Sequence, residues 1–228
     1  MDYDINWLGR TLVIAPHPDD EVLGAGGTIA RLSAQGHDVS VAIVTSGKLP
    51  LFTIEDANRS KAEALAAHAL LGVKETYWLD LPAAELTEVR NADLNGAIDE
   101  VVKHVAPQTI LAPFVGDMHV DHQLVFRSIM VASRPHQNAY PRTVLAYETL
   151  SESNWNAPYV TAPFVPNVYI EISQYLDCKL EAMGKFVSQL RAPPHERSIE
   201  GLRNLALMRG ATIHRNAAEC FVLMRHVL

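Results

Sequence analysis

Cysteine is scarce in this sequence, and its placement suits neither cross-linking nor metal binding. Cys178 and Cys220 are the only two among 228 residues. Two cysteines make no disulfide framework, and these two form no C-x-x-C pair. We expect both to behave as small apolar residues in a reduced, cytoplasmic protein.

Positive charge is in short supply as well. The 19 Lys and Arg residues are outnumbered by 26 Asp and Glu residues, so the net charge is −7 with neutral His. No basic run overcomes this average, and nucleic acid is therefore not an expected partner.

Long apolar runs are missing too. No window approaches the roughly 18 consecutive apolar residues that a membrane span needs. The N-terminal segment Met1–Trp7 begins with acidic residues and lacks the cationic start and apolar stretch of a secretory signal. We therefore expect neither a membrane span nor a leader. With 48% apolar and 20% charged residues, the composition favours a single globular domain over residues 1–228.

The first two-thirds of the chain alternates strand and helix patterns. Short apolar runs predict strands, and amphipathic or Ala-rich segments predict helices. The strands are predicted at 11–15, 39–45, 76–81, 109–114 and 143–147, and the helices at 21–34, 54–71, 92–105 and 121–133. Strands separated by helices of this length pair in parallel. The sequence thus predicts an α/β fold, a Rossmann-like three-layer sandwich with a mostly parallel sheet.

The C-terminal third is less regular. Residues 151–166 contain three prolines and predict a long loop. Further along, the pattern predicts a strand at 168–172, helical spacing from 176 to 190, a helix at 199–213 and a last strand at 220–224.

Histidine and carboxylates follow the first predicted strand directly, as His17-Pro18-Asp19-Asp20-Glu21. Carboxylates favour the positive N-terminus of a helix, which would explain Asp20 and Glu21. That explanation accounts for neither His17 nor the adjacent Asp19.

A second such cluster follows the fourth predicted strand and contains Asp117, His119, Asp121 and His122. In a doubly wound sheet the first and fourth strands commonly flank the crevice where ligands bind. The two clusters are therefore expected to face each other. Imidazole and carboxylate ligands suit zinc, and catalytic zinc sites use three protein ligands plus a water. A zinc site at this edge of the sheet is the prediction.

The segments 16–27 and 119–122 closely resemble the two signature motifs of the LmbE/PIG-L family of zinc-dependent de-N-acetylases. Similarity extends over almost the whole chain, at Arg59, Glu63, Leu71-Gly72, Tyr147-Glu148-Thr149, Pro166-Asn167-Val168, Ser188-Gln189 and Ala218-Glu219. The resemblance implies a hydrolase that removes the N-acetyl group from an N-acetylglucosamine-type amino sugar or its conjugate. Relatives of this kind are often oligomers, so a homo-oligomer is also expected.

The same resemblance assigns the metal site. It implies that His17, Asp20 and His122 bind Zn²⁺ and that Asp19 is the general base. Zinc lowers the pKa of a bound water to about 7, which makes a nucleophile available near neutral pH.

Three further roles are implied by the resemblance. His119 is the electrophile or acid, oriented by Asp121, and in its protonated form it would stabilise the oxyanion together with zinc. Either His119 or Asp19 protonates the leaving amine. Arg59 is the expected substrate contact, with an ion pair to Glu63 as the alternative.

Other interpretations stay open. The chain could be a zinc amidase for a different amide, such as a thiol conjugate, or a non-catalytic metal- or sugar-binding protein. Asp19 argues against the latter, because a pure binding site needs no base. His195 and His214 are candidates to enter the site from the C-terminal third.

The glycines of the first motif suggest a dinucleotide fingerprint only superficially. After Gly24 and Gly26, the third glycine of G-x-G-x-x-G would fall at Ile29. We expect these glycines, with Gly27, to let the helix pack close to the sheet or to the metal-binding loop.

Overall fold

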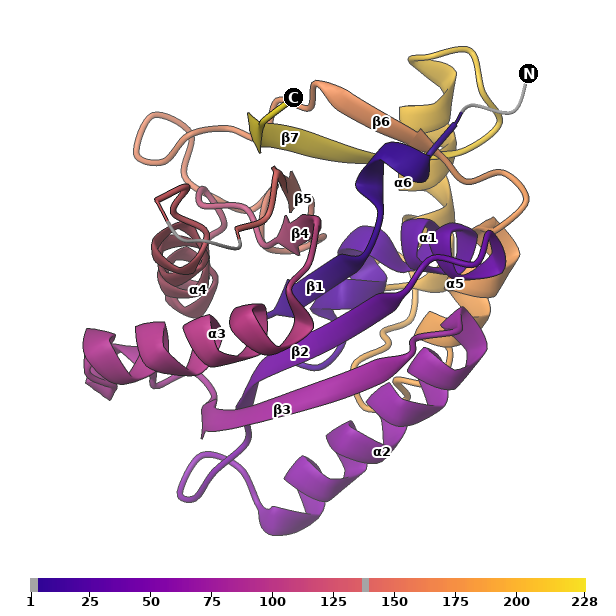
Figure 1. Ribbon diagram of the computed structural model, residues 1–228. Helices are drawn as coiled ribbons and strands as arrows, with labels where there is room; N and C mark the ends of the chain where they lie inside the picture. The colour runs from indigo at the N-terminus through magenta and orange to yellow at the C-terminus, as the bar shows by residue number, and fades with distance from the viewer. Residues whose placement is uncertain (1–3, 137–139) are drawn as a thin grey trace.

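The computed structural model describes residues 4–136 and 140–228 (Figure 1), so the first three residues of the acidic N-terminal segment lie outside it. The described residues form a seven-stranded sheet in the order β3-β2-β1-β4-β5-β7-β6. β1 to β5 pair in parallel, and β7 runs antiparallel to both β5 and β6. The strands are β1 (Thr11–Ala15), β2 (Val39–Ser46), β3 (Glu75–Pro82), β4 (Thr109–Ala112), β5 (Thr143–Tyr147), β6 (Val168–Glu171) and β7 (Ala218–His226).

Helices cover both faces of the sheet, which confirms the predicted three-layer α/β sandwich (Figure 1). Along β1, Val13 and Ala15 pack into one apolar cluster while Leu12 and Ile14 pack into the other. Burial on both faces explains why the parallel strands are continuously apolar. One face carries α1 (Asp20–Ala34), α2 (Ile54–Leu71), α5 (Leu176–Met183) and α6 (Ile199–Ala211), and the other carries α3 (Asn91–Val105) and α4 (Val120–Ala132).

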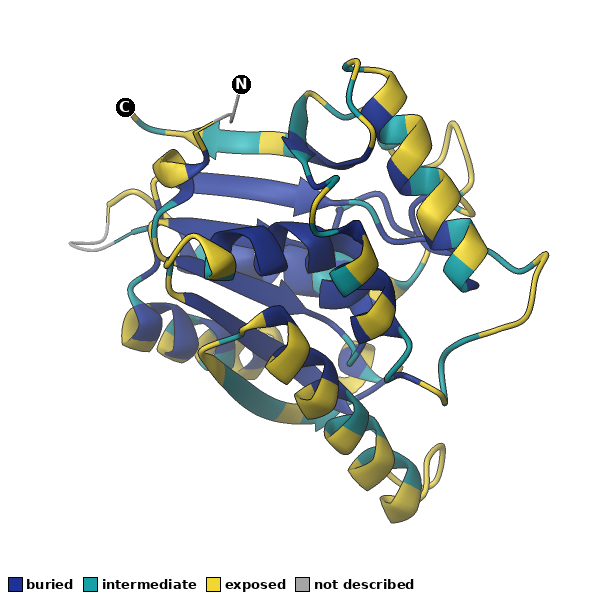
Figure 2. Ribbon diagram, turned by 90° about the vertical axis from the view of Figure 1, so that its right-hand side faces the viewer, coloured by how far each residue is buried: buried dark blue, intermediate teal, exposed yellow. Residues whose placement is uncertain are grey.

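The order of the strands places the two polar motifs at one edge. β1 and β4 are neighbours, with Thr11 paired to Thr109, and both run in the same direction. Their carboxyl ends therefore meet, and the loops that follow them open at the same switch point. Figure 2 shows the buried strands at the centre and the exposed outer sides of the helices.

The glycines of the first motif lie where side chains do not fit, as expected. A Cβ on Gly24 would lie 2.3 Å from the Tyr147 ring, and one on Gly27 would lie 2.6 Å from Ile172. These glycines allow α1 to approach the sheet and the segment after β6 closely.

The predicted helical spacing from 176 to 190 was only partly right. α5 ends at Met183, and the chain then turns, so that the backbone amide of Ser188 donates to Glu63 on α2 at 3.0 Å. β4 is also shorter than predicted and ends before Pro113, which has no N–H to donate to a neighbouring strand. Among the described helices, none combines the length and the apolar character that crossing a membrane requires.

Candidate active site

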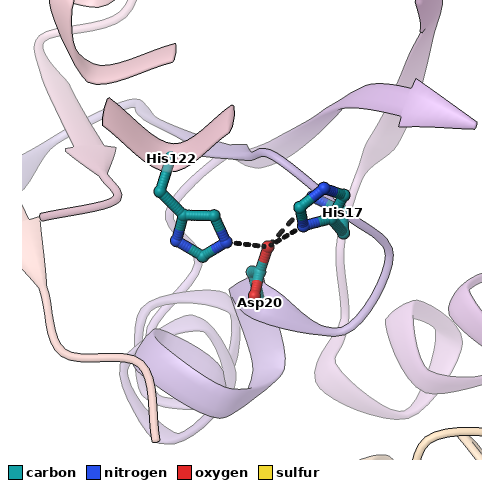
Figure 3. Close-up of side chains that lie close together, drawn as sticks. All are labelled: His17, Asp20 and His122. Atoms are coloured by element: carbon teal, nitrogen blue, oxygen red, sulfur yellow. Dashed lines mark hydrogen bonds and ion pairs between the residues drawn. The ribbon is translucent and has the colours of Figure 1, made fainter. Parts of the chain in front are cut away.

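Three side chains from the two motifs converge beyond the ends of β1 and β4. His17 lies in the loop after β1, Asp20 begins α1 and His122 lies in the first turn of α4. The Oδ2 atom of Asp20 lies 3.4 Å from Nδ1 of His17 and 3.2 Å from Nε2 of His122. Figure 3 shows both rings directed at this carboxylate. One ligand atom from each residue lies within 4.8 Å of the others, so the group can hold a metal ion.

The ring of His122 is prepared for such a role. Asp117, fully buried, lies 2.8 Å from Nδ1 of His122 and also accepts from Ser153 at 2.6 Å. An Nδ1–H donated to Asp117 leaves a lone pair on Nε2. Within the described part of the chain, that buried Nε2 has no hydrogen-bond partner, although Asp20 is near. A metal ion would give this atom the partner that it lacks.

The ring of His17 is fixed from its other side. Its Nε2 lies 3.0 Å from the Asp121 carboxylate, which also accepts from the backbone amides of Ala84 at 2.8 Å and Leu86 at 3.3 Å. His17, His119 and Asp121 form a second group of possible ligands. The group with Asp20 and His122 is the better metal site, because among the described residues the buried Nε2 of His122 has no hydrogen-bond partner.

The electrostatics favour a cation between the three side chains. Burial opposes ionisation, yet the charge of His122 and the hydrogen bond from His17 hold the pKa of Asp20 well below its usual range. Although burial works against the charged ring, hydrogen bonds to Asp121 and Asp20 raise the pKa of His17 to about 9. The pKa of His122 is raised as well, against its burial, by Asp20 and Asp117. A divalent ion would displace these protons.

Asp19 lies next to the cluster but is directed differently. Its backbone has φ 123°, and its carboxylate accepts from Arg197 at 3.3 Å. Burial and the neighbouring Asp20 raise the pKa of Asp19 well above its ordinary value, while Arg197 lowers it. A buried carboxylate with a raised pKa is suited to accept and return a proton.

His119 has a fixed tautomer. Its Nδ1 accepts from the backbone amide of Asp121 at 3.1 Å, so a neutral ring carries its proton on Nε2. Burial and the nearby His17 cation lower the pKa of His119 to about 4. This favours a neutral ring at neutral pH, in contrast to the protonated form considered from the sequence. The expected orientation also differs, because the backbone of Asp121 contacts His119 while its carboxylate contacts His17.

A cavity of about 390 Å³ opens over Asp19, His17 and His119. This volume lies within the usual range for small-molecule sites, roughly 300–1,000 Å³. Arg59 lies at its wall with a 58% exposed side chain and forms an ion pair with Asp56, not with Glu63. The other polar residues of the wall include Ser46, Ser60, Lys61, Glu152, Ser188, Gln189 and Arg197.

Arg197 is the site residue that sequence reasoning missed. It follows no periodic pattern, because it lies in the irregular segment before α6. Besides Asp19 it contacts Ser151 at 2.7 Å and Glu152 at 3.2 Å. Of the two histidines expected from this region, His195 accepts from the amide of Arg197 at 3.0 Å and His214 is exposed. Neither belongs to a possible metal-binding group of the described residues.

Both the sequence and the fold are similar to those of known proteins. Residues 12–133, more than half of the chain, match the PIG-L family model, described as GlcNAc-PI de-N-acetylase. A protein of Escherichia coli (strain K12), named the uncharacterized deacetylase YaiS, is 30% identical over 183 residues, covering 78% of this chain and 90% of that protein.

Two further similarities extend over nearly the whole chain. The diacetylchitobiose deacetylase of Thermococcus kodakarensis is 28% identical over 235 residues, covering 96% of this chain and 86% of the relative. The solved structure of the N,N'-diacetylchitobiose deacetylase from Pyrococcus horikoshii superposes with a TM-score of 0.75 at 26% identity. That superposition covers 98% of this chain and 88% of the other.

Proposed function

Because this chain belongs to the PIG-L family, described as GlcNAc-PI de-N-acetylase, we propose that it is a zinc-dependent deacetylase of an N-acetylglucosamine-type sugar or its conjugate. The observation that carries the proposal is the convergence of His17, Asp20 and His122 next to a cavity that His17 and Asp19 line. Relatives named as deacetylases of acetylated amino sugars, including diacetylchitobiose, support the same reaction.

His17, Asp20 and His122 are the proposed zinc ligands. Two imidazoles and one carboxylate are a donor set that suits zinc, and three protein ligands leave a position open for chemistry. Bound there, zinc would supply a Lewis acid and a water of lowered pKa.

Asp19 is the proposed general base. Its carboxylate takes a proton from the attacking water as the water adds to the acetyl carbonyl carbon. The Nε2–H of His119 then donates to the developing oxyanion, a role that a neutral ring can perform. Since a neutral His119 has no spare proton to give, Asp19 returns its proton to the leaving amine.

The polar wall of the cavity fits a sugar with many hydroxyl groups. Arg59 and Lys61 offer donors from α2, and Gln189 offers an amide from the segment after α5. Phe52 lines the cavity as well and gives the face of the sugar ring an apolar contact. We propose Arg59 as a substrate contact that leaves its exposed ion pair with Asp56 when the sugar binds.

The proposal extends to the surroundings of the enzyme. We expect a cytoplasmic protein, since neither Cys178 nor Cys220 forms a disulfide. We also expect a homo-oligomer, because Tyr159, Val160 and Val165 are exposed apolar residues. Light scattering of the purified protein measures its mass and would refute this expectation if only the monomer were found.

The experiment that tests the function measures free amine released from N-acetylglucosamine, from N,N'-diacetylchitobiose and from a thiol conjugate of glucosamine. Each is assayed with the purified protein, after chelation and after zinc is restored. Zinc-dependent amine release from an acetylated sugar is the expected result. Release from the thiol conjugate alone would redirect the proposal to a different amide. If zinc is bound and no amine is released from any of the substrates, the proposed function is overturned.

A further inference from the structure

The backbone of Asp19 adopts a conformation that residues other than glycine rarely take. Its φ is 123° and its ψ is −28°. Such a geometry persists only where the surrounding structure enforces it, and it occurs often at functional sites. The peptide groups after Asp19 belong to α1, since the amides of Val22 and Leu23 both donate to its carbonyl oxygen. On the N-terminal side of Asp19, the contact that can hold this conformation is the hydrogen bond that its own backbone amide donates.

That amide donates to a buried carboxylate. The backbone N–H of Asp19 lies 3.2 Å from Oε2 of Glu21, and the Glu21 residue is 0% exposed. Glu21 does not face solvent; its side chain lies between α1 and α2. Its second oxygen, Oε1, lies 3.0 Å from Nε2 of His68 on α2, which is 3% exposed.

His68 is held in turn from the opposite side of its ring. Its Nδ1 lies 2.8 Å from the hydroxyl of Thr76 on β3. With Nε2–H donating to Glu21, the Thr76 hydroxyl can donate to Nδ1, and both ring nitrogens have partners. A continuous chain of hydrogen bonds thus runs from β3 through α2 to the amide of Asp19, part-buried at Thr76 and buried at His68 and Glu21.

We propose that His68 is a positioning residue for the deacetylation, acting through Glu21 to hold Asp19 in its strained backbone conformation and so to direct its carboxylate into the cavity. The inference rests on the proposed role of Asp19 as the base. The metal ligands are fixed by other contacts, since Asp20 accepts from the amide of His17 at 2.9 Å and His122 contacts Asp117. Loss of the His68 contact should therefore affect the chemical step more than metal binding.

The rival explanation is purely structural. His68 and Glu21 join α1 to α2, and their pair could serve only to pack these helices together. Two substitutions of equal polarity separate the explanations. In His68→Gln the side-chain amide reaches the position of Nε2 and can still donate to Glu21. In His68→Asn the amide reaches only the position of Nδ1, so the contact to Thr76 is kept and the donor to Glu21 is lost.

The experiment measures kcat, KM and zinc content of both variants with the acetylated sugar that the wild-type protein cleaves best. We expect His68→Gln to keep kcat close to the wild-type value. We expect His68→Asn to lower kcat roughly 10- to 100-fold, as misplaced catalytic groups do, with KM and zinc content unchanged. Equal kcat in the two variants, or loss of zinc in parallel with activity, would overturn the proposal.

Two further variants serve as a control and as a replacement for His68→Asn. Thr28→Val removes another buried hydrogen bond of α1, that of Thr28 to Glu219 at 2.6 Å, without touching the chain to Asp19. It should lower the melting temperature and leave kcat unchanged; a matching fall in kcat would favour the structural explanation. If His68→Asn does not fold, Glu21→Leu takes its place, because leucine has a similar size but cannot accept a hydrogen bond from the Asp19 amide. It should lower kcat as well.

Crystal structures of the zinc-loaded variants give a readout that does not need turnover. The φ of Asp19 should stay positive in His68→Gln and relax to a negative value in His68→Asn. Unchanged φ in both would overturn the positioning role. Should the wild-type protein cleave no substrate, the proposed function fails by itself, and these structures still decide whether His68 holds Asp19.

Discussion

The guanidinium of Arg197 lies 3.3 Å from the carboxylate of Asp19, although 178 positions separate the two residues. Arg197 reaches this place from the segment before α6, where its other nitrogens contact Ser151 and Glu152. The pKa of Asp19 therefore reflects two opposing influences. Burial and Asp20 raise it, and Arg197 lowers it.

Removing the charge of Arg197 should change the pH profile. Asp19 acts as a base only when ionised, so activity is lost as the pH falls through its pKa. In Arg197→Gln that pKa rises further, and the acid limb of kcat/KM should move to higher pH by about one pH unit. Arg197→Lys keeps a positive charge and should move the limb less. If the acid limb of kcat/KM does not move in Arg197→Gln, then it does not report the ionisation of Asp19.

Substituting Asp19 itself should separate catalysis from metal binding. Asp19→Asn keeps the size of the side chain but cannot take up a proton, so kcat should fall by roughly 10²- to 10⁴-fold. Zinc content, measured by elemental analysis, should stay equal to that of the wild-type protein. Asp20→Asn is the matched control at the neighbouring position and should lose zinc and activity together. Loss of zinc in Asp19→Asn would make Asp19 a ligand and not the base.

The glycine at position 24 should tolerate no side chain. In Gly24→Ala the new Cβ would lie 2.3 Å from the ring of Tyr147, whose hydroxyl donates to the carbonyl of Ile14 at 2.9 Å. The ring cannot move away without breaking that buried bond. We expect a loss of about 1–3 kcal/mol in the free energy of unfolding, measured in urea.

Gly96 on α3 provides the control for this substitution. No atom lies within 4 Å of a Cβ built there, so Gly96→Ala should stabilise the helix by about 0.5–1 kcal/mol. Destabilisation of similar size at both positions would mean that crowding against Tyr147 is not the cause.

The meeting of His17 and His122 was predictable because both follow strands of a parallel sheet. Parallel strands end at one edge, and the first and fourth strands of a doubly wound sheet commonly flank its switch point, as β1 and β4 do here. The residues that act on these side chains were harder to predict. Asp121 was expected at His119, but the amides of a distant turn, at Ala84 and Leu86, hold its carboxylate beside His17.

Irregular segments account for the remaining differences. The helical spacing from 176 to 190 reflects burial only in part: after α5 has ended at Met183, Leu190 packs against the core but Val187 is exposed. Burial is recorded in the sequence as hydrophobicity, whereas the path of a turn depends on single hydrogen bonds such as that of Ser188 to Glu63. Arg197 lies in a segment of the same kind, and its charge alone gave no reason to place it beside Asp19.

Asp117 was present in the second cluster of the sequence without an assigned role, and its contact with His122 predicts one. A carboxylate that binds the far nitrogen of a metal-binding histidine fixes the tautomer and the orientation of the ring. In Asp117→Asn the amide oxygen can still accept from His122 Nδ1, but the negative charge is gone. Zinc affinity, measured by competition with a chelator, should fall roughly 10- to 100-fold. Ser153→Ala removes only the hydroxyl that donates to Asp117 at 2.6 Å and should weaken zinc binding less.

If Asp117→Asn binds zinc as tightly as the wild-type protein, His122 either uses its other nitrogen or is no ligand. A crystal structure of the zinc-loaded protein distinguishes these two outcomes, because the ring of His122 would be turned in the first and distant from the metal in the second.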